Sequence, residues 1–532
     1  MATKKKATKK KATKKKATKK RATKKKATKK KATKKKATKK KAAKRRAASG
    51  TPPAGSKQTS PKGKRGTQPK DSLPHIAGIG LKNFKCFSDL PVLSLTPITV
   101  LTGPNSCGKS SVIQALVLLK QSLESSTAQS TLVFNDMVKL GSAQRVLTSG
   151  SGVNNFSIEL MVHAPLYTGG APDPGDHENW LVTLSFGPSL DEKKSSQVQR
   201  IQLSPLGEKP LLTITPREQT TGEDEPEFWA TFHSKEALEN TSTPLGNQVR
   251  VPYKAKMSLG FISPENVQVK WKSKGDRRPE MLPFQFFFPS IDRVFRALEF
   301  GLTQQLAYIG PLRTEPADLY VQNTRRIGVR GENCMAYLRA HQKDKIRDGM
   351  PGGGSAPLLE CVNAWLVRLG ASSGIRFERM GDLHFEVLTQ DSRHLNEVGC
   401  GVGQLLPVVV QCLTAMGDEV VLLEQPEIHL HQRLQAGLAD LVLACRSRGV
   451  RFVVETHSEI FIQRLRRRIA ESQGKDLRDD VSVHFGEGNR FISIEIDHCG
   501  AVNMWPEHFF DQGLKEMRAL ANAASGKRTS EA

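Results

Sequence analysis

The chain reads Gly103-Pro104-Asn105-Ser106-Cys107-Gly108-Lys109-Ser110-Ser111 directly after a short β-type run, Ile98-Thr99-Val100-Leu101. Apolar residues at helical spacing follow, at Val112, Ile113, Leu116 and Leu119. The pattern G-x-x-x-x-G-K-S between a strand and a helix is typical of a polyphosphate-binding loop, because backbone N–H groups at a helix N-terminus attract dense negative charge. We expect this stretch to bind the phosphates of a nucleoside triphosphate, with Lys109 on the β- and γ-phosphates and the Ser110 hydroxyl on Mg²⁺.

The formal net charge of +29 is carried by one end of the chain. Residues 1–70 contain 32 Lys and Arg and no Asp or Glu, whereas the rest contains 49 basic and 52 acidic residues. From Ala2 to Lys41 the unit Ala-Thr-Lys-Lys-Lys/Arg occurs eight times. A period of five turns a helix about 140° beyond one full turn, so no apolar face forms, and like charges four residues apart repel. We therefore expect residues 1–73 to form a disordered tail and linker.

In composition this tail resembles the lysine-rich tails of linker histones and of bacterial histone-like proteins. Lysines that neutralise phosphates release counterions, so DNA is the expected partner of the tail; RNA, polyphosphate or solvent alone are the alternatives. Contacts of this kind carry no base-sequence information.

Composition also argues against several classes of protein. The eight cysteines are scattered without a C-x-x-C spacing, which argues against a zinc site. No apolar run reaches the roughly 18 residues of a membrane span, and no apolar segment follows the basic N-terminus as it would in a signal peptide. We expect a cytoplasmic, nucleoid-associated protein with no membrane partner.

The body of the chain falls into three stretches of different pattern. Short alternating runs over residues 150–285 predict mostly antiparallel sheet, and helical patterns follow at about 289–307, 332–344 and 356–369. From residue 396 a Gly-rich segment leads into an apolar helix, Leu405 to Met416, and then into alternating strand and helix. The expected elements there are a strand at 419–423, a helix at about 431–445 and a strand at 451–454. This alternation predicts an α/β nucleotide-binding sheet.

Both of the late strands end in polar residues. The first ends in Glu424-Gln425-Pro426-Glu427 and the second in Glu455-Thr456-His457-Ser458. A carboxylate at the carboxyl end of a parallel strand lies beside the bound Mg²⁺ in phosphate-loop ATPases, so we expect Glu424 to support the metal.

The order of these parts resembles that of ABC-type ATPases of the RecF and OLD branch, which includes SMC heads. A bacterial AAA-family group within it is closer still, and that group often ends in a domain of unknown function bearing Trp-Pro-x-x-Phe-Phe-Asp-Gln. The resemblance rests on Asn83-Phe84-Lys85, Leu140-Gly141-Ser142, Ile309-Gly310-Pro311-Leu312-Arg313, Glu424-Gln425-Pro426-Glu427-Ile428-His429-Leu430-His431 and Trp505 to Gln512.

The fold implied by this resemblance is α/β. It is an ABC-type ATPase head with a mixed sheet, an antiparallel β insertion and a helical subdomain. The implied domains are the tail at 1–73, the ATPase domain at 74–480 with its insertion at about 150–395, and a C-terminal domain at 481–532.

The resemblance also implies roles for single residues. His457 would contact the γ-phosphate or the attacking water. Gly401, Gly403 and Gln404, in the loop from Gly399, would reach the γ-phosphate bound by a second copy, which gives an ATP-dependent homodimer. His429 and His431 would lie near the dimer seam, or alternatively are buried structural histidines.

Two departures from the resembled pattern concern hydrolysis. Gln425 stands where typical ABC proteins have a Glu general base, which makes Glu427 a candidate base. Gly403 stands where relatives carry Ser, so we expect weak contact across the dimer and slow hydrolysis. Arg313 and Arg330 could each reach phosphate or form a structural ion pair.

No acidic cluster of the nuclease type follows His457, so we expect no nuclease domain. The expected function is an ATPase that acts as a dimeric switch on DNA, in genome maintenance or anti-phage defence, with a separate nuclease or effector as partner. The alternative is a non-enzymatic nucleoid-binding protein that uses ATP binding only for assembly.

Overall fold

The computed structural model describes residues 74–125, 132–164, 178–188, 196–216, 227–232, 250–254, 257–258, 261–262, 268–271, 280–283, 289–322, 325–472, 477–504, 506 and 512–530. The chain divides into two units, Met1–Pro69 and Lys70–Ala532. The lysine-rich tail lies outside the described residues, as do Trp505 and residues 507–511, so the predictions for both stay predictions.

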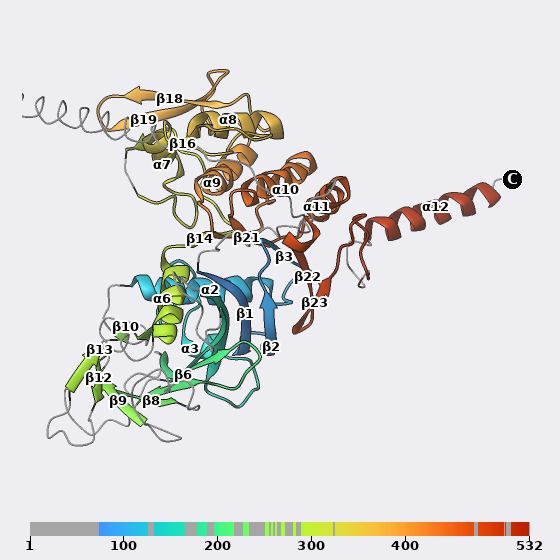
Figure 1. Cartoon of the computed structure of the whole chain (residues 1–532). Helices are drawn as coiled ribbons and strands as arrows, with labels where there is room; N and C mark the ends of the chain where they lie inside the picture. The colour runs from blue at the N-terminus through green and yellow to red at the C-terminus, as the bar shows by residue number, and fades with distance from the viewer. Residues whose placement is uncertain are drawn as a thin grey trace, which may run out of the picture. The chain divides into compact units, whose positions relative to one another are not determined.

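A six-stranded sheet forms the centre of the second unit (Figure 1), and its first five strands run parallel. β3 and β20 are buried along their whole length, which is typical of parallel strands covered on both faces. The α/β sheet expected from the sequence is therefore confirmed. In sheet order the strands are β14 (Leu306–Ile309), β20 (Val420–Glu424), β21 (Arg451–Glu455), β3 (Ile98–Thr102), β22 (Val481–Glu487) and the antiparallel β23 (Arg490–Ile494).

Successive residues of these parallel strands pack into two different hydrophobic cores. Val420 and Leu422 of β20 belong to one core, and Val421 and Leu423 belong to the other. Successive side chains of a strand point to opposite faces of the sheet, so one strand contributes to both cores. Because both faces are apolar, these strands appear in the sequence as uninterrupted apolar runs.

The first core lies between the central sheet and a ten-stranded sheet. The described pairings of this larger sheet are antiparallel, as the sequence predicted. Its order is β13-β12-β9-β8-β7-β6-β5-β4-β1-β2, so it includes two strands that precede the phosphate loop in sequence. The bounds are β1 His75–Phe84, β2 Phe87–Ser94, β4 Phe156–His163, β5 Asn179–Pro188, β6 Ser196–Pro205, β7 Leu212–Pro216, β8 Glu227–Phe232, β9 Arg250–Lys254, β12 Gln268–Trp271 and β13 Glu280–Pro283.

Helices cover both faces of the central sheet. α2 (Lys109–Glu124) contacts β20 and β21 on the side of the ten-stranded sheet, and α6 (Pro289–Thr303) packs on α2 and β1. α6 ends at Thr303, earlier than the predicted helix at 289–307, because Leu306 to Ile309 pair with β20 as a strand. The short helix α3 is Ala143–Val146, and the small strands are β10 Met257–Ser258, β11 Phe261–Ile262, β15 Tyr320–Val321, β16 Lys345–Ile346, β17 Ala356–Pro357, β18 Ile375–Met380 and β19 His384–Thr389.

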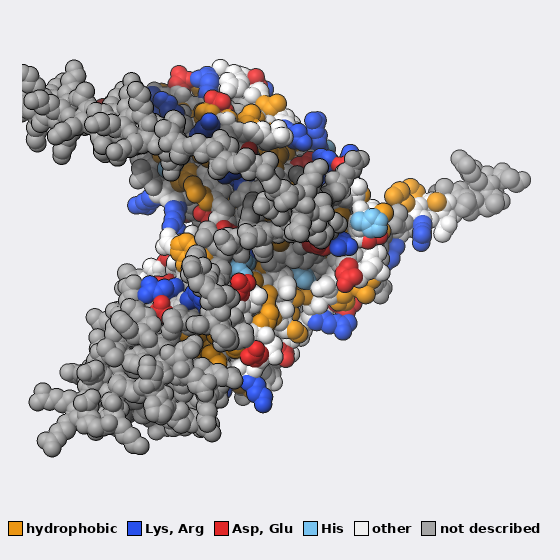
Figure 2. Space-filling view, viewed as in Figure 1, with side chains coloured by type: hydrophobic (Ala, Val, Ile, Leu, Met, Phe, Trp, Pro, Cys, Tyr) orange, Lys and Arg blue, Asp and Glu red, His pale blue; other side chains and the backbone are white. Residues whose placement is uncertain are grey.

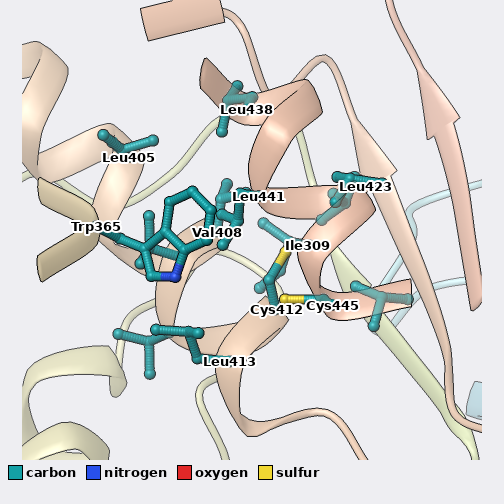
Figure 3. Packing of buried hydrophobic residues seen from close by; sticks show 14 of the residues in the cluster. Ile309, Trp365, Leu405, Val408, Cys412, Leu413, Leu423, Leu438, Leu441 and Cys445 are labelled. Carbon is teal, nitrogen blue, oxygen red and sulfur yellow. The ribbon is translucent and has the colours of Figure 1, made fainter. Parts of the chain in front are cut away.

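The second core lies among the helices on the other face. Figure 3 shows Trp365 of α8 beside Leu405 and Val408 of α9, with Leu438 and Leu441 of α10 close by. No helix among the described ranges is long and apolar enough to cross a membrane. The remaining helices are α7 Cys334–His341, α8 Leu358–Leu369, α9 Cys400–Thr414, α10 Gln432–Arg446, α11 Glu459–Glu471, the 3-10 turn η2 Arg478–Asp480 and α12 Gln512–Ser530.

The described surface carries mixed charge. Figure 2 shows acidic and basic side chains interspersed on the face in view. This agrees with the near balance of 49 basic and 52 acidic residues beyond residue 70.

Candidate functional site

The phosphate loop connects β3 to α2, and its two glycines are required by its surroundings. Gly103 has φ 131° and Gly108 has φ 93°, both in the left-handed region. A Cβ on Gly103 would lie 2.7 Å from the carbonyl oxygen of Gly486 in β22, and one on Gly108 would lie 2.3 Å from the Phe87 ring. The backbone of the loop is therefore fixed by contact with β22 and with the start of β2.

Lys109 lies inside its own loop. The residue is 4% exposed, and its Nζ donates to the carbonyl oxygens of Gly103 at 3.1 Å and Pro104 at 2.7 Å. These bonds hold the ammonium group over the loop, where the sequence predicts the β- and γ-phosphates.

Ser110, Glu455 and Glu424 meet at the carboxyl end of the central sheet. The Ser110 hydroxyl donates to Glu455 Oε1 at 2.9 Å. Glu455 ends β21, and in the parallel register of β20 with β21 its partner is Glu424. Glu455 is not among the site residues predicted from the sequence, although it shares the pattern that singled out Glu424, an apolar strand that ends in an acid.

Both carboxylates lie in surroundings that disfavour their charge. Burial, with the neighbouring charge of Glu455, raises the pKa of Glu424 to about 8, against opposing effects of Tyr308 and Lys85. Burial also raises the pKa of Glu455, against the hydroxyl of Ser110 and the charge of Lys109. Glu424 Oε1 and Glu455 Oε2 are buried and have no hydrogen-bond partner.

These residues fit a Mg²⁺ ion. Carboxylate and hydroxyl oxygens are the ligands that Mg²⁺ prefers, and the orphaned oxygens of Glu424 and Glu455 offer two of them. In the described part of the chain no group of three or more His, Cys, Asp or Glu could hold a metal ion. Mg²⁺ usually binds through one or two carboxylates together with substrate phosphates, and the set formed by Ser110, Glu424 and Glu455 matches that pattern.

Glu427 fixes the segment that carries His457. Its Oε1 accepts a hydrogen bond from the His457 backbone N–H at 2.6 Å, while its Oε2 is buried without a partner. Burial raises the pKa of Glu427, against the hydrogen bond from His457. Partial burial and the charge of Lys109 lower the pKa of the His457 ring, which favours its neutral form. The effect of Lys109 shows that the ring lies within electrostatic range of the phosphate loop.

Arg313 supports the turn after β20. The residue is 4% exposed, and its Nη2 donates to the carbonyl oxygens of Glu424 and Gln425 at 3.1 Å each. Gln425 has φ 44°, and its N–H donates to the Glu455 carbonyl oxygen at 2.8 Å. Burial lowers the pKa of Arg313 to about 10, against the charge of Glu427. Arg313 therefore serves the turn through backbone carbonyls, and Arg330 likewise donates to the Leu312 carbonyl oxygen at 3.3 Å.

The Gly-rich segment is helical, which corrects the expectation of a loop from Gly399 to Gln404. α9 begins at Cys400, so Gly401, Gly403 and Gln404 are among its first five residues. A Cβ on Gly403 would lie 2.3 Å from Pro316 Cγ, and the Gln404 side chain donates to the Arg313 carbonyl oxygen at 3.2 Å. This helix start is packed against the segment that follows β14.

The two histidines after β20 are exposed, so the interpretation of them as buried structural residues was wrong. His431 is the N-cap of α10, because its Nδ1 accepts from the Arg433 N–H at 3.3 Å. A Cβ on Gly401 would lie 3.1 Å from the carbonyl oxygen of His429, which places the start of α9 close to this turn.

Comparison with family models identifies three segments of the chain. Residues 75–159 match the "AAA ATPase domain" model and residues 373–462 match "AAA domain, putative AbiEii toxin, Type IV TA system". The first segment contains the phosphate loop, and the second contains the start of α9, Glu424, Glu455 and His457. These two segments are therefore similar to AAA ATPase domains, and they carry the residues that meet at the carboxyl end of the central sheet. Residues 478–520 match "Protein of unknown function (DUF3696)".

Solved structures of SMC heads are similar to the chain at low identity. One is an SMC head bound to the C-terminal winged-helix domain of ScpA, with 11% identity, TM-score 0.35, and coverage of 80% of this chain and 98% of that one. A second is the SMC head domain from Thermotoga maritima, with 12% identity, TM-score 0.32, and coverage of 80% of this chain and 99% of that one. A third is an SMC head with an extended coiled coil bound to the C-terminal domain of ScpA, derived from Pyrococcus furiosus. It has 11% identity, TM-score 0.33, and coverage of 84% of this chain and 100% of that one. No curated protein matches the chain.

Proposed function

We propose that this ATPase domain binds and slowly hydrolyses ATP with Mg²⁺, and that it acts as a nucleotide-dependent dimeric switch on DNA. The observation that carries the proposal is the meeting of Ser110, Glu455 and Glu424 beside Lys109, at the carboxyl end of a parallel sheet. Ligands of open α/β sheets bind at that edge.

The residues of the site have separable tasks in this proposal. The backbone N–H groups of residues 103–110 and the Lys109 ammonium bind the phosphates, and Ser110 with Glu424 holds the cation. Mg²⁺, when bound, neutralises phosphate charge. Glu427 holds the His457 backbone through one oxygen, and its second oxygen, Oε2, is the candidate acceptor for the proton of the attacking water.

A second copy of the chain completes the site in this proposal. The start of α9, with Gly401, Gly403 and Gln404, would contact the γ-phosphate bound by the partner copy. Gly403 packs on Pro316 and offers no hydroxyl, so the contact across the dimer is weak and hydrolysis is slow. ATP binding would therefore join two copies and hydrolysis would release them.

The lysine-rich tail supplies the DNA contact. The 32 basic residues of residues 1–70 stand beside a body of almost balanced charge, so affinity for DNA comes from the tail. If about ten phosphates are neutralised, log affinity falls with log salt at a slope near −9. The tail places the protein on the nucleoid, in genome maintenance or anti-phage defence, where a separate nuclease or other effector carries out the chemistry on nucleic acid.

Steady-state ATPase assays with and without DNA test this function. We expect DNA to stimulate hydrolysis, Lys109→Ala to abolish it, and deletion of residues 2–70 to remove the stimulation while basal hydrolysis stays. Binding of DNA measured at several salt concentrations should show the steep slope for the full chain only. A purified protein that neither binds nor hydrolyses ATP would refute the proposal.

Two residues favour a second candidate, a nucleoid-binding protein that uses ATP binding only for assembly. Gln425 cannot accept a proton, and Gly403 lacks the hydroxyl that related helices offer. Single-turnover measurements separate the two candidates. Phosphate release that depends on Glu424 or Glu427 would remove the assembly-only candidate, whereas ATP binding and dimer formation without any phosphate release would support it.

A further inference from the structure

We propose that Glu455 is a second carboxylate of the divalent-cation site, and that Glu455, Glu424 and Ser110 together bind a divalent cation in the absence of nucleotide. The inference rests on the proposed function, because it concerns the cation of the same site. It assigns a role to a residue that the sequence did not single out.

The strand register places Glu455 between the other two groups. Its backbone pairs with Glu424 on one side and with Leu101 of β3 on the other, and β3 leads into the phosphate loop. The Ser110 hydroxyl reaches Glu455 directly at 2.9 Å. Glu455 therefore links the two residues that the phosphate-loop pattern assigns to the cation, although they lie more than 300 positions apart in the sequence.

The two carboxylates are buried, and neither has partners for both of its oxygens. Glu424 is 4% exposed and Glu455 is 2% exposed, and each has one buried oxygen without a hydrogen-bond partner. Buried charges are normally paired or bound to a metal, because desolvation of an unpaired carboxylate is costly. The charges of Lys85 and Lys109 reach these carboxylates, but Lys85 donates its hydrogen bond to Gln114 and Lys109 donates to its own loop. A divalent cation between the carboxylates would satisfy both of them.

A shared proton is the competing explanation, because two adjacent carboxylates can reduce their repulsion by keeping one proton between them. Ser110 favours the cation. Its hydroxyl hydrogen is directed to Glu455, which leaves the oxygen lone pairs free to bind a metal. Ser110 is also only half-buried, and the neighbouring loop residues 104–106 are exposed, so an ion can enter from solvent.

The test is a titration of the full-length, nucleotide-free protein with Mn²⁺ alone, in which free Mn²⁺ is followed by electron paramagnetic resonance. We expect one Mn²⁺ per chain, displaced by Mg²⁺, and an affinity at least about tenfold lower in Glu455→Gln and in Glu424→Gln. Glu419→Gln is the matched control, because Glu419 is a half-buried carboxylate just before β20, at the opposite end of the strand from Glu424. It makes the same change of charge and should leave the affinity unchanged.

Thermal unfolding with EDTA or Mg²⁺ gives a second measurement that does not depend on catalysis. In EDTA, Glu455→Gln should unfold at the wild-type temperature or above it, because a buried like charge has been removed. Wild-type protein should gain stability from Mg²⁺, and Glu455→Gln should gain less. Wild-type Mn²⁺ affinity in Glu455→Gln, or no Mn²⁺ binding by the wild type, would overturn the inference and favour the shared proton.

Failure of this inference can be told from failure of the proposed function. ATP binding in EDTA depends on the phosphate loop and should be kept by Glu455→Gln. If the protein binds Mn²⁺ through Glu455 but never binds ATP, the cation site is supported and the ATPase proposal is refuted. If it binds ATP but has the same Mn²⁺ affinity with and without Glu455, the ATPase proposal stands and the role of Glu455 in the cation site is refuted.

Discussion

The replacement Gly486→Ala tests whether β22 sets the shape of the phosphate loop. Gly486 is the next-to-last residue of β22, and its φ is outside the left-handed region, so the backbone itself accepts alanine. The added Cβ would lie 2.3 Å from Cys107 Sγ and 3.0 Å from Cys107 Cβ. Cys107 is a loop residue that is 3% exposed, so it has little free space into which it can move.

The size of the effect follows from this overlap. Non-bonded heavy atoms are most stable at about 3.5–4.0 Å, so the sulfur contact is too short by more than about 1 Å. Overpacking of a buried site costs about 1–3 kcal/mol, and we expect a loss of about 2 kcal/mol in the free energy of unfolding. Movement of the loop relieves part of the strain at the expense of phosphate binding. If about 1.4 kcal/mol of the strain is transferred to phosphate binding in this way, the affinity for ATP falls about tenfold.

Urea unfolding and titration with a fluorescent ATP analogue measure the two effects. Gly488→Ala is the control in the same hairpin, since Gly488 has φ 60° and its added Cβ would meet nothing within 4 Å. It should cost only the left-handed backbone energy of about 1–2 kcal/mol and leave ATP affinity unchanged. The double variant Gly486→Ala with Cys107→Ala removes the sulfur and should recover most of the affinity. Wild-type affinity in Gly486→Ala, or no recovery in the double variant, would refute the reasoning.

Two further predictions concern the start of α9 and the turn after β20. Gly403→Ser would place its Cβ 2.3 Å from Pro316 Cγ, so it should lower the free energy of unfolding, measured in urea, by about 1–3 kcal/mol. The additional replacement Pro316→Ala should restore most of this stability. An unchanged urea midpoint in Gly403→Ser would contradict this packing. Arg313→Met removes the hydrogen bonds to the carbonyl oxygens of Glu424 and Gln425, each worth about 1.5–3 kcal/mol, while it also relieves the burial of a charge, so we expect a net loss of about 2 kcal/mol. A rise in stability of Arg313→Met on thermal unfolding would show that the buried charge costs more than its bonds supply.

Local patterns determined the phosphate loop and the strands beside it. Gly103, Gly108 and Lys109 stand at fixed spacing between a β-type run and a helical run, and in the structure both glycines lie between β3 and α2 while Lys109 begins α2. The acid at the end of β20 was found in the same way. Such features depend on neighbours within about ten residues, where periodicity and backbone preference act directly.

The tertiary structure alone decided which of these residues meet. Glu455 pairs with Glu424 because β20 and β21 pair in one register, and Gly486 limits the loop because β22 lies beside β3. Arg313 and Gln404 come from β14 and α9 regions more than ninety positions apart, yet they join in one hydrogen bond. Register and helix start are set by packing of whole elements into the two cores, a long-range energy that no short stretch of sequence contains.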